Sequence, residues 1–287
     1  MIKINSSNSH ESEPREFKEI LGALVQRGEL EMIKAGYDFL GNVAILKFPE
    51  KTKIREKKEF AKKILNERKN VETVLEKAEK VHGRLRTITT KFLMGKKTKE
   101  ALYCESGCRF KLNVDTCYFS PRLSNERLEV AGKIKKNDSV LVLFSGVAPF
   151  PIVIAKHSQA KKIVAVELGR ECCKYAKENV KLNKLSNVEI IQGDVKKLDK
   201  LIKKENFDVI VMPRPQLKDS FLKYIWKFAK KNTKVYYYDF GKDAEEIIDK
   251  VLLEAKNAGK NIKIFNFKKA GEIAPYKYRW RVDLKIL

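Results

Sequence analysis

Apolar and polar positions follow two alternating rhythms along the second half of the chain, because short apolar runs typical of buried strands are separated by segments with helical spacing. The predicted strands cover residues 138–146, 161–169, 187–195, 207–215, 233–241, 262–270 and 278–287. The predicted helices cover residues 125–134, 150–158, 170–185, 220–230 and 243–259. This order predicts an α/β fold with a mostly parallel sheet covered on both faces and with ligands at the carboxyl ends of its strands. We expect the last two strands to pair antiparallel at the edge of the sheet.

The first part of the chain has a different pattern. A helix is predicted over residues 15–33, and two short strands are predicted around a Gly41-Asn42 turn within residues 37–48. A basic segment, residues 51–81, has helical spacing of its apolar side chains, and short alternating segments follow it. The sequence therefore predicts a flexible tail (residues 1–16), a small α+β domain (residues 17–117) and a Rossmann-like domain (residues 118–287).

The charge of the chain predicts a polyanionic partner. Lysine and arginine number 61 against 37 acidic residues, which gives a formal net charge of +24 spread over the whole length. Binding to nucleic acid would release the counterions of its phosphates, and the alternative is a lysine bias imposed by an AT-rich genome. No apolar run reaches the roughly 18 residues of a membrane helix, and no secretory signal is visible. We expect a cytoplasmic monomer with no membrane contact.

The five cysteines predict no metal site. They form no CxxC pair, and Cys104 and Cys108 lack a second pair or a nearby histidine in a chain with three histidines. We expect free thiols in a reducing compartment and no metal cofactor.

The strand ends carry a candidate nucleotide-binding pattern. Gly146 lies in a turn of small residues after the first strand of the parallel part, and about twenty residues later the next strand ends in Glu167. Asp194 follows the third strand, where a carboxylate can accept from an adenine amino group, while Glu167 can accept from both ribose hydroxyls. Each acid alone is also typical of a helix cap, and neither GxGxxG nor a P-loop is present. The ordered set predicts S-adenosylmethionine as cofactor, with Phe144, Val147 and Val195 beside these residues.

The segment "YFSPRLSNERLEVA", residues 118–131, immediately precedes the first strand of this pattern. Ser124 is a candidate cap for a helix that carries Glu126 and Arg127 in its first turn. In one interpretation Glu126 merely complements the helix dipole. In the other interpretation its side chain borders the methyl donor.

The motifs "YFSPRLSNER", "FSGVAPF" and "VIVMPRP" resemble those of the tRNA (guanine-37-N1)-methyltransferase family of archaea and eukaryotes, which includes the aminocarboxypropyltransferases of wybutosine synthesis. The resemblance covers residues 17–287 and includes "GYDFLGNVAIL" and "GRLR". It implies a class I S-adenosylmethionine-dependent methyltransferase fold and the anticodon stem-loop of tRNA as partner. It also implies that Glu126 is the general base, that Arg86 is the catalytic arginine, and that Tyr118, Arg127 and Pro215 lie on the cofactor side.

These implied roles agree with the chemistry of the reaction. Guanine N1 carries a proton, so a base must remove it as the methyl group arrives. Negative charge then develops on O6, and an arginine beside that oxygen stabilises it.

Three features depart from the family pattern. Pro213-Arg214-Pro215 replaces the usual Asn-Leu-Pro, so an amide side chain is lost and a cation is gained for a phosphate or a base. Val142 replaces an acidic residue, and too few residues precede Phe17 for the extra N-terminal domain that inspects tRNA. Arg122, Pro213 and Arg214 are the predicted substrate-binding residues, and substrate choice is expected to differ most at the triplet.

Alternatives to guanosine methylation remain open. Aminocarboxypropyl transfer, or methylation of a tricyclic wybutosine precursor, would use the same cofactor. A tRNA-binding protein without catalysis is a reading from another class. The stretch "PYKYRWRV", residues 275–282, alternates aromatic and basic residues, which is typical either of an RNA-stacking surface or of an edge strand; we favour the strand.

Overall fold

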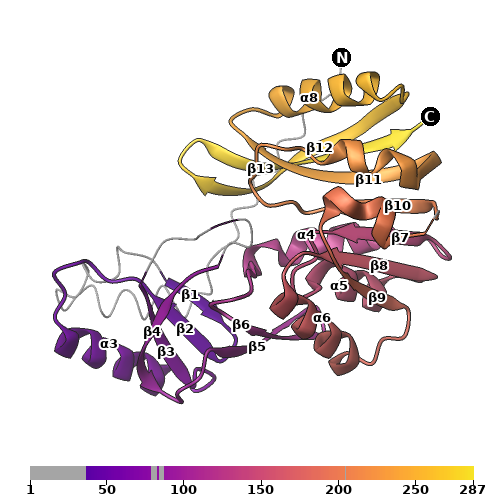
Figure 1. Ribbon diagram of the computed structural model, residues 1–287. Coiled ribbons are helices and arrows are strands. Elements are labelled where there is room, and N and C mark those ends of the chain that lie inside the picture. Colours follow the sequence, from indigo (N-terminus) through magenta and orange to yellow (C-terminus); the bar gives the residue numbers. More distant parts are fainter. Residues whose placement is uncertain (1–36, 79–82, 84–86, 204) are drawn as a thin grey trace.

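The computed structural model describes residues 37–78, 83, 87–203 and 205–287, and it contains a small domain beside a larger α/β domain (Figure 1). The predicted tail and the predicted helix at residues 15–33 lie outside the described residues. Within the described residues, no helix combines the length and apolarity needed to cross a bilayer.

The small domain is built on a four-stranded sheet with the order β1-β2-β3-β4. Its strands are β1 (Tyr37–Leu40), β2 (Val43–Leu46), β3 (Thr73–Lys77) and β4 (Thr90–Gly95), and helix α3 (Ile54–Glu67) packs on it. The predicted β1–β2 hairpin is confirmed. Gly41 is required at its turn because its φ is +58° and a Cβ atom there would lie 1.8 Å from the Leu102 carbonyl oxygen.

The helix predicted over residues 51–81 is wrong in its second half. Helix α3 ends at Glu67, and residues 73–77 form strand β3, which pairs in parallel with β2 and antiparallel with β4. The β-branched residues Thr73 and Val74 are fully buried between these neighbours, so packing within the sheet overrides the helical spacing of the preceding residues.

A two-stranded hairpin, β5 (Glu100–Glu105) and β6 (Cys108–Asn113), connects the small domain to helix α6 (Arg170–Leu182). The fully buried Asn179 of α6 donates to the carbonyl oxygens of Lys111 (3.0 Å) and Val147 (3.1 Å) and accepts from the Lys111 N–H (2.7 Å). Asn183 pairs in the same way with the backbone of Arg109. Side-chain amides thus satisfy the free edge of β6 and attach the hairpin to the larger domain.

The larger domain contains a seven-stranded sheet with the order β12-β13-β11-β10-β7-β8-β9. Its strands are β7 (Ser139–Leu143), β8 (Lys162–Glu167), β9 (Val188–Gln192), β10 (Phe207–Met212), β11 (Ala229–Gly241), β12 (Ile262–Ala274) and β13 (Lys277–Ile286). Strands β7 to β11 are mutually parallel, and β13 pairs antiparallel with both β11 and β12. The predicted α/β fold and the antiparallel final pair are confirmed, and β12 is the edge strand, so "PYKYRWRV" belongs mostly to an interior strand.

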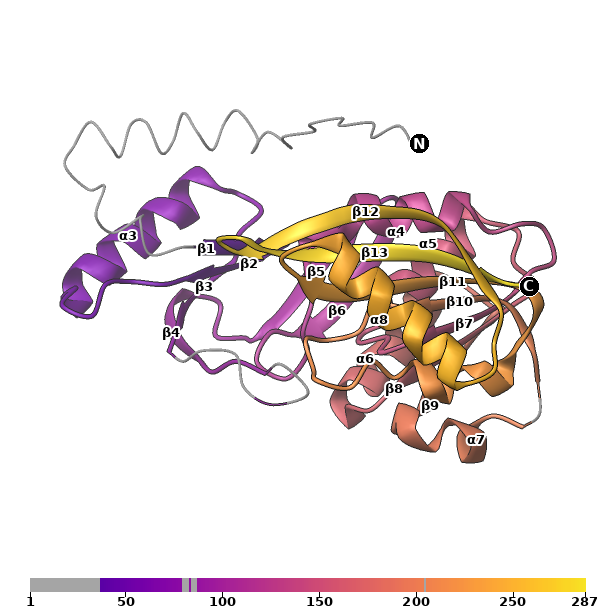
Figure 2. The same ribbon diagram turned by 90° about the horizontal axis from the view of Figure 1, so that it is seen from above.

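Helices cover both faces of this sheet, as Figures 1 and 2 show. Helices α4 (Ser124–Gly132), α5 (Pro149–His157) and α6 pack over one apolar core. Helices α7 (Leu198–Leu201) and α8 (Ala244–Asn257) pack over the other core. The doubly covered sheet leaves the carboxyl ends of the parallel strands at one edge, where the predicted site residues lie.

Two details of the helix predictions are wrong. The segment predicted as a helix at residues 220–230 forms two 3₁₀ turns, η3 (Leu222–Tyr224) and η4 (Trp226–Phe228), before β11 begins. Phe221 precedes them with a φ of 65°, and a continuous α-helix cannot accommodate that left-handed residue. Ser124 does not cap α4, because the 3₁₀ turn η1 (Pro121–Leu123) runs directly into the helix and Leu123 occupies the cap position without a side-chain hydrogen bond.

We expect Asn179→Ala to lower the free energy of unfolding by about 1–3 kcal/mol, because buried N–H and C=O groups of Lys111 and Val147 would lose their partner. Urea denaturation measures this change, and Lys177→Ala, at an exposed position of the same helix, is the matched control. Equal stability of the two variants would contradict the proposed attachment of the hairpin.

Candidate functional site

A cavity lies at the carboxyl ends of the parallel strands. The loops after β7, β8, β9 and β10 line it, together with η1 and the ends of β11 and β13. Predicted site residues in its wall are Tyr118, Arg127, Phe144, Gly146, Glu167, Asp194, Val195, Pro213, Arg214 and Pro215. The fold therefore gathers residues that are almost a hundred positions apart in the sequence.

The loop after β7 has an unusual backbone. Phe144, Gly146 and Ala148 have φ angles of 56°, 56° and 68°, and such left-handed conformations are strained for the two residues that carry a side chain. The loop is held in place because the Ser145 N–H donates to the Val166 carbonyl oxygen (3.1 Å) and the Ala148 N–H donates to the Ser145 carbonyl oxygen (2.9 Å). Strain retained in this way is typical of a loop that approaches a ligand closely.

Glu167 occupies the end of β8 and connects two loops. Its carboxylate accepts from the Gly146 N–H (2.8 Å) and the Gly169 N–H (2.7 Å). Burial raises the pKa of Glu167, and the two N–H groups offset this effect in part. The carboxylate is thereby fixed in the cavity wall with further acceptor capacity for a ligand's hydroxyl groups.

The cavity wall fits the nucleoside part of S-adenosylmethionine. We expect Glu167 to accept from the ribose hydroxyls. Asp194 lies in the wall after β9, and its side chain also accepts from the Lys196 N–H (3.0 Å). The buried Ser145 hydroxyl, also in the wall, has no hydrogen-bond partner among the described residues. A buried hydroxyl without a partner is costly, so a polar ligand that bonds to it would remove that cost.

Two residues predicted on the cofactor side have other contacts. Arg127, which is 1% exposed, forms a bidentate ion pair with Glu105 of β5, and its Nη2 donates to the Ser120 carbonyl oxygen (3.1 Å). Its charge is thus neutralised by the hairpin, although the side chain still lines the cavity. Val147 is fully buried behind the loop and does not line the cavity.

Glu126 does not line the cavity itself but contacts Tyr238, which does. Its Oε2 accepts from the Tyr238 hydroxyl (3.0 Å) and from Arg281 Nη1 (2.8 Å), while Oε1 pairs with Lys268 Nζ (2.6 Å). Tyr238 is one of the residues that line the cavity, whereas Glu126 is not. In this structure the candidate base therefore reaches the cavity through a tyrosine hydroxyl.

Glu126 belongs to a group that we call the α4–β13 ion cluster, which also contains Glu129, Lys268, Arg281 and Asp283. Arg281 is fully buried and donates to the carboxylates of Glu126, Glu129 and Asp283. Burial alone would raise the pKa of Glu129, but hydrogen bonds from Arg281 and Lys268 hold it at about 2. The cluster keeps α4 and its carboxylates fixed against β13.

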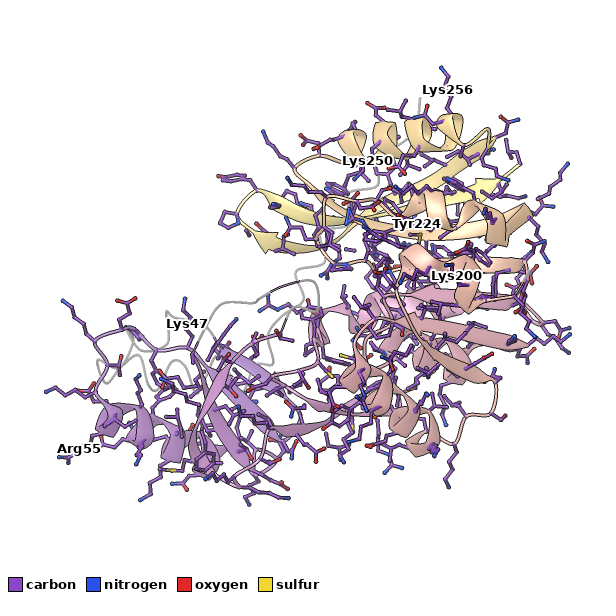
Figure 3. All side chains as sticks on the ribbon, viewed as in Figure 1. Lys47, Arg55, Lys200, Tyr224, Lys250 and Lys256 are labelled. Atoms are coloured by element: carbon purple, nitrogen blue, oxygen red, sulfur yellow. The ribbon has the colours of Figure 1, made fainter. Side chains whose placement is uncertain are left out.

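The expectation that Arg214 offers a cation to the substrate is corrected by its contacts. Its side chain is turned inward and is 1% exposed: Nη2 pairs with Asp239 Oδ1 (2.7 Å), Nε donates to the Tyr237 hydroxyl (3.2 Å), and Nη1 and Nη2 donate to carbonyl oxygens of the loop. Lys250 of α8, labelled in Figure 3, also pairs with Asp239 (3.0 Å). Arg214 therefore fixes the turn after β10. Its guanidinium is neutralised by Asp239 and bonded to the loop, and the proline that follows it restricts the backbone.

The remaining predicted substrate residues lie in different places. Pro213 and Pro215 line the cavity. Arg122 is exposed outside it, with Nη2 3.7 Å from Asp38 of the small domain. Arg86 lies outside the described residues.

Sequence reasoning missed several polar residues of the cavity wall, among them Ser145, Tyr238 and Arg279. Ser145 stands beside Gly146, which was the signal that could have found it. Tyr238 and Arg279 come from β11 and β13, and only the antiparallel pairing of these strands brings them to the cavity. No local sequence pattern indicates that β13 pairs with β11.

Comparison with known proteins identifies two matching family profiles. Residues 101–265 match the TRM5/TYW2 methyltransferase domain, and residues 17–98 match the TYW2 N-terminal domain. The methyltransferase match begins at the second residue of β5, so nearly all of the β5–β6 hairpin falls within it.

Curated relatives extend over nearly the whole chain. The tRNA (guanine(37)-N(1))-methyltransferase Trm5b of Pyrococcus abyssi is 30% identical, over 95% of this chain and 81% of its own length. The tRNA (guanine(37)-N(1))/4-demethylwyosine(37)-methyltransferase Taw22 of Nanoarchaeum equitans is 30% identical, over 88% of this chain and 99% of its own. A tRNA(Phe) (4-demethylwyosine(37)-C(7)) aminocarboxypropyltransferase of Methanocaldococcus jannaschii is 28% identical, over 87% and 97%.

Solved structures also match nearly the whole chain. The crystal structure of Trm5b from Pyrococcus abyssi superposes with a TM-score of 0.78 at 28% identity, covering 99% of this chain and 82% of that one. A complex of aTrm5 with tRNALeu superposes with a TM-score of 0.79 at 25% identity, covering 100% and 82%.

We expect Glu167→Gln to weaken S-adenosylmethionine binding by about 10- to 100-fold at neutral pH, because a charged acceptor for the ribose hydroxyls is lost. In the unaltered protein the affinity should fall as pH drops through the raised pKa of Glu167, because the ligand favours the deprotonated carboxylate. Isothermal titration calorimetry across pH measures both effects, with Glu171→Gln, an exposed glutamate of α6, as control. A glutamine variant that keeps the same affinity and the same pH dependence would rule out this role.

Proposed function

The chain belongs to the TRM5/TYW2 family of S-adenosylmethionine-dependent tRNA methyltransferases, and we propose that it methylates N1 of the guanosine at position 37, beside the anticodon. The observation that supports the proposal is the cavity: an acidic half at β8 and β9, which would bind the nucleoside, adjoins a second half formed by β10, β11 and β13. The similarity to Trm5b over 95% of the chain supports the choice of guanosine N1.

We propose Glu126 as the general base, acting through Tyr238. When bound, S-adenosylmethionine supplies the electrophilic methyl group. As N1 takes up the methyl, its proton passes to the Tyr238 oxygen while the Tyr238 hydroxyl proton passes to Glu126 Oε2, which is 3.0 Å away. Arg281 and Lys268 remain charged beside Glu126, so the neighbouring cluster holds the carboxylate in position during the transfer. Arg86, by resemblance, would stabilise the charge on O6.

The basic surface of the small domain supports a tRNA partner. Helix α3 places Arg55, Lys58 and Lys62 on its exposed side, and Figure 3 shows the labelled Lys47 and Arg55 on the outside of this domain. With a net charge of +24, such residues would neutralise phosphates of the anticodon stem-loop and release their counterions. The target nucleotide would leave the loop and enter the cavity.

A second candidate is a reaction of the wybutosine pathway on the same nucleotide. The match of residues 17–98 to the TYW2 N-terminal domain favours it, as do the relatives named for 4-demethylwyosine. Pro213, at the substrate half of the cavity, removes an amide side chain that the resemblance leads us to expect, which is consistent with a different acceptor base.

One experiment separates these functions. Unmodified tRNA transcripts and tRNA carrying 4-demethylwyosine are each incubated with S-adenosylmethionine labelled in the methyl group or in the aminocarboxypropyl chain, and the modified nucleoside is mapped by mass spectrometry. We expect methyl label on N1 of guanosine 37. Transfer of the side-chain label, or transfer only to the tricyclic base, would replace the proposal with the second candidate. Absence of any transfer, with tRNA still bound, would indicate a non-catalytic binding protein.

We expect Glu126→Gln to slow single-turnover methyl transfer by about 10²- to 10⁴-fold without changing S-adenosylmethionine affinity, because the proton acceptor is lost. Tyr238→Phe should show a similar loss, since it interrupts the path to Glu126.

Glu129→Gln is the matched control. It removes one carboxylate from the same ion cluster but does not touch Tyr238, so it should retain most of the activity. Full activity of Glu126→Gln would refute the assignment of the base, whereas full activity of Tyr238→Phe alone would refute the relay.

A further inference from the structure

Arg279 is a buried cation in the cavity wall without a charged partner. It lies on β13, is 7% exposed and lines the cavity. Its guanidinium carbon lies 5.2 Å from the ring centroid of Phe240, its neighbour on β11. Among the residues that the structure describes, no carboxylate pairs with it and no hydrogen bond from its guanidinium is found.

The other arginines of the cavity differ from Arg279. Arg127 is neutralised by Glu105, and Arg214 is neutralised by Asp239 and held by carbonyl oxygens of its own loop. The guanidinium nitrogens of Arg279 keep contact with solvent in the cavity, while the rest of the residue is buried beside the Phe240 ring. Arg279 is therefore the cavity arginine with unused capacity to bind an electronegative group.

The position of Arg279 in the sheet indicates which ligand it meets. Glu167 and Asp194 lie at the ends of β8 and β9, whereas β13 lies on the far side of β7, beyond β10 and β11. Arg279 and the two acids proposed to bind adenosine are thus at opposite ends of the cavity. The turn of the β12–β13 hairpin lies on the side of the molecule where the small domain is, as Figures 1 and 2 show, and Arg279 belongs to β13 close to this turn.

The burial of Arg279 distinguishes a base from a backbone phosphate. Phosphates remain at the surface of a bound stem-loop, where exposed lysines such as those of α3 can reach them. Arg279 is 7% exposed as a residue and lines the cavity, so it meets instead the part of the nucleotide that is inserted, which is the base.

We propose that Arg279 is a base-binding residue, which donates hydrogen bonds to a carbonyl oxygen of the inserted base. This inference rests on the proposed function, in which that oxygen is guanine O6. As N1 loses its proton to the Tyr238–Glu126 pair and bonds to the methyl group, negative charge develops on O6. Arg279 then gains a counter-charge that it lacks before the reaction, so its interaction is stronger in the transition state than in the free enzyme.

The test uses Arg279→Met, Arg279→Lys and the control Lys277→Met, an exposed cation two residues earlier on the same strand. Single-turnover methyl transfer to an unmodified transcript is measured against pH, together with the S-adenosylmethionine affinity and the thermal midpoint. We expect Arg279→Met to lose about 10²- to 10³-fold in rate with unchanged cofactor affinity. The pH dependence of this variant's rate should shift to higher pH, because the guanine that has lost its N1 proton is no longer stabilised by the cation. Arg279→Lys should recover part of the rate, and Lys277→Met should match the unaltered protein.

Three results would overturn the inference. Weaker S-adenosylmethionine binding in proportion to the lost rate would place the cofactor's carboxylate at Arg279. A rate loss that disappears on a transcript with a methylphosphonate 5′ of residue 37 would assign Arg279 to that phosphate. An unchanged pH profile, with the lysine variant as slow as the methionine variant, would leave only a packing role.

The proposed function is tested separately by the unaltered protein in the same assay. If it transfers no methyl group to guanosine, the proposed function fails and this inference fails with it. If it transfers the group and Arg279→Met does so equally fast, only this inference fails.

Discussion

The cofactor half of the site depends on one buried carboxylate. Glu167 accepts from the Gly146 and Gly169 N–H groups, so a single side chain joins the strained loop after β7 to the start of α6. The same helix carries Asn179, which holds the backbone of the β5–β6 hairpin and the Val147 carbonyl oxygen. The position of the connecting hairpin and the shape of the cofactor loop are therefore set by the same helix.

The substrate half is organised by charge. Arg127 and Arg214 are each paired with a carboxylate and fix the hairpin and the turn after β10, while Arg281 fixes Glu126 on α4. Such ion pairs fix the positions of their side chains more than they raise the net stability, because desolvation offsets much of their attraction. Arg279 is the exception, because no ionic partner for it is found among the described residues, and the sheet order places it opposite Glu167 and Asp194, the acids proposed to bind the nucleoside. The two halves of the cavity thus differ in charge: carboxylates lie at β8 and β9, and a cation that has no carboxylate partner within the described part of the chain lies at β13.

The sequence predicted the parts of this arrangement that depend on local pattern. The parallel strands and the acids at their ends could be read directly, because each strand is a short apolar run followed by its functional residue. The inward orientation of the Arg214 side chain could not be predicted, because its partners Tyr237 and Asp239 lie on another strand. The prediction of a helix at residues 220–230 was also wrong. Its apolar residues are buried, and the left-handed conformation of Phe221 separates them from the preceding chain. Arg279 reaches the cavity through antiparallel pairing of β13 with β11, which no local signal reveals.

A crystal structure with S-adenosylhomocysteine and an anticodon stem-loop would show whether the cavity is divided into a nucleoside half and a base half. We expect the ribose hydroxyls on Glu167, the adenine beside Asp194, and the guanine at position 37 between the Pro213–Pro215 turn and Arg279, with O6 at the guanidinium. A base that stacks elsewhere, or a cofactor that places its carboxylate on Arg279, would contradict this division.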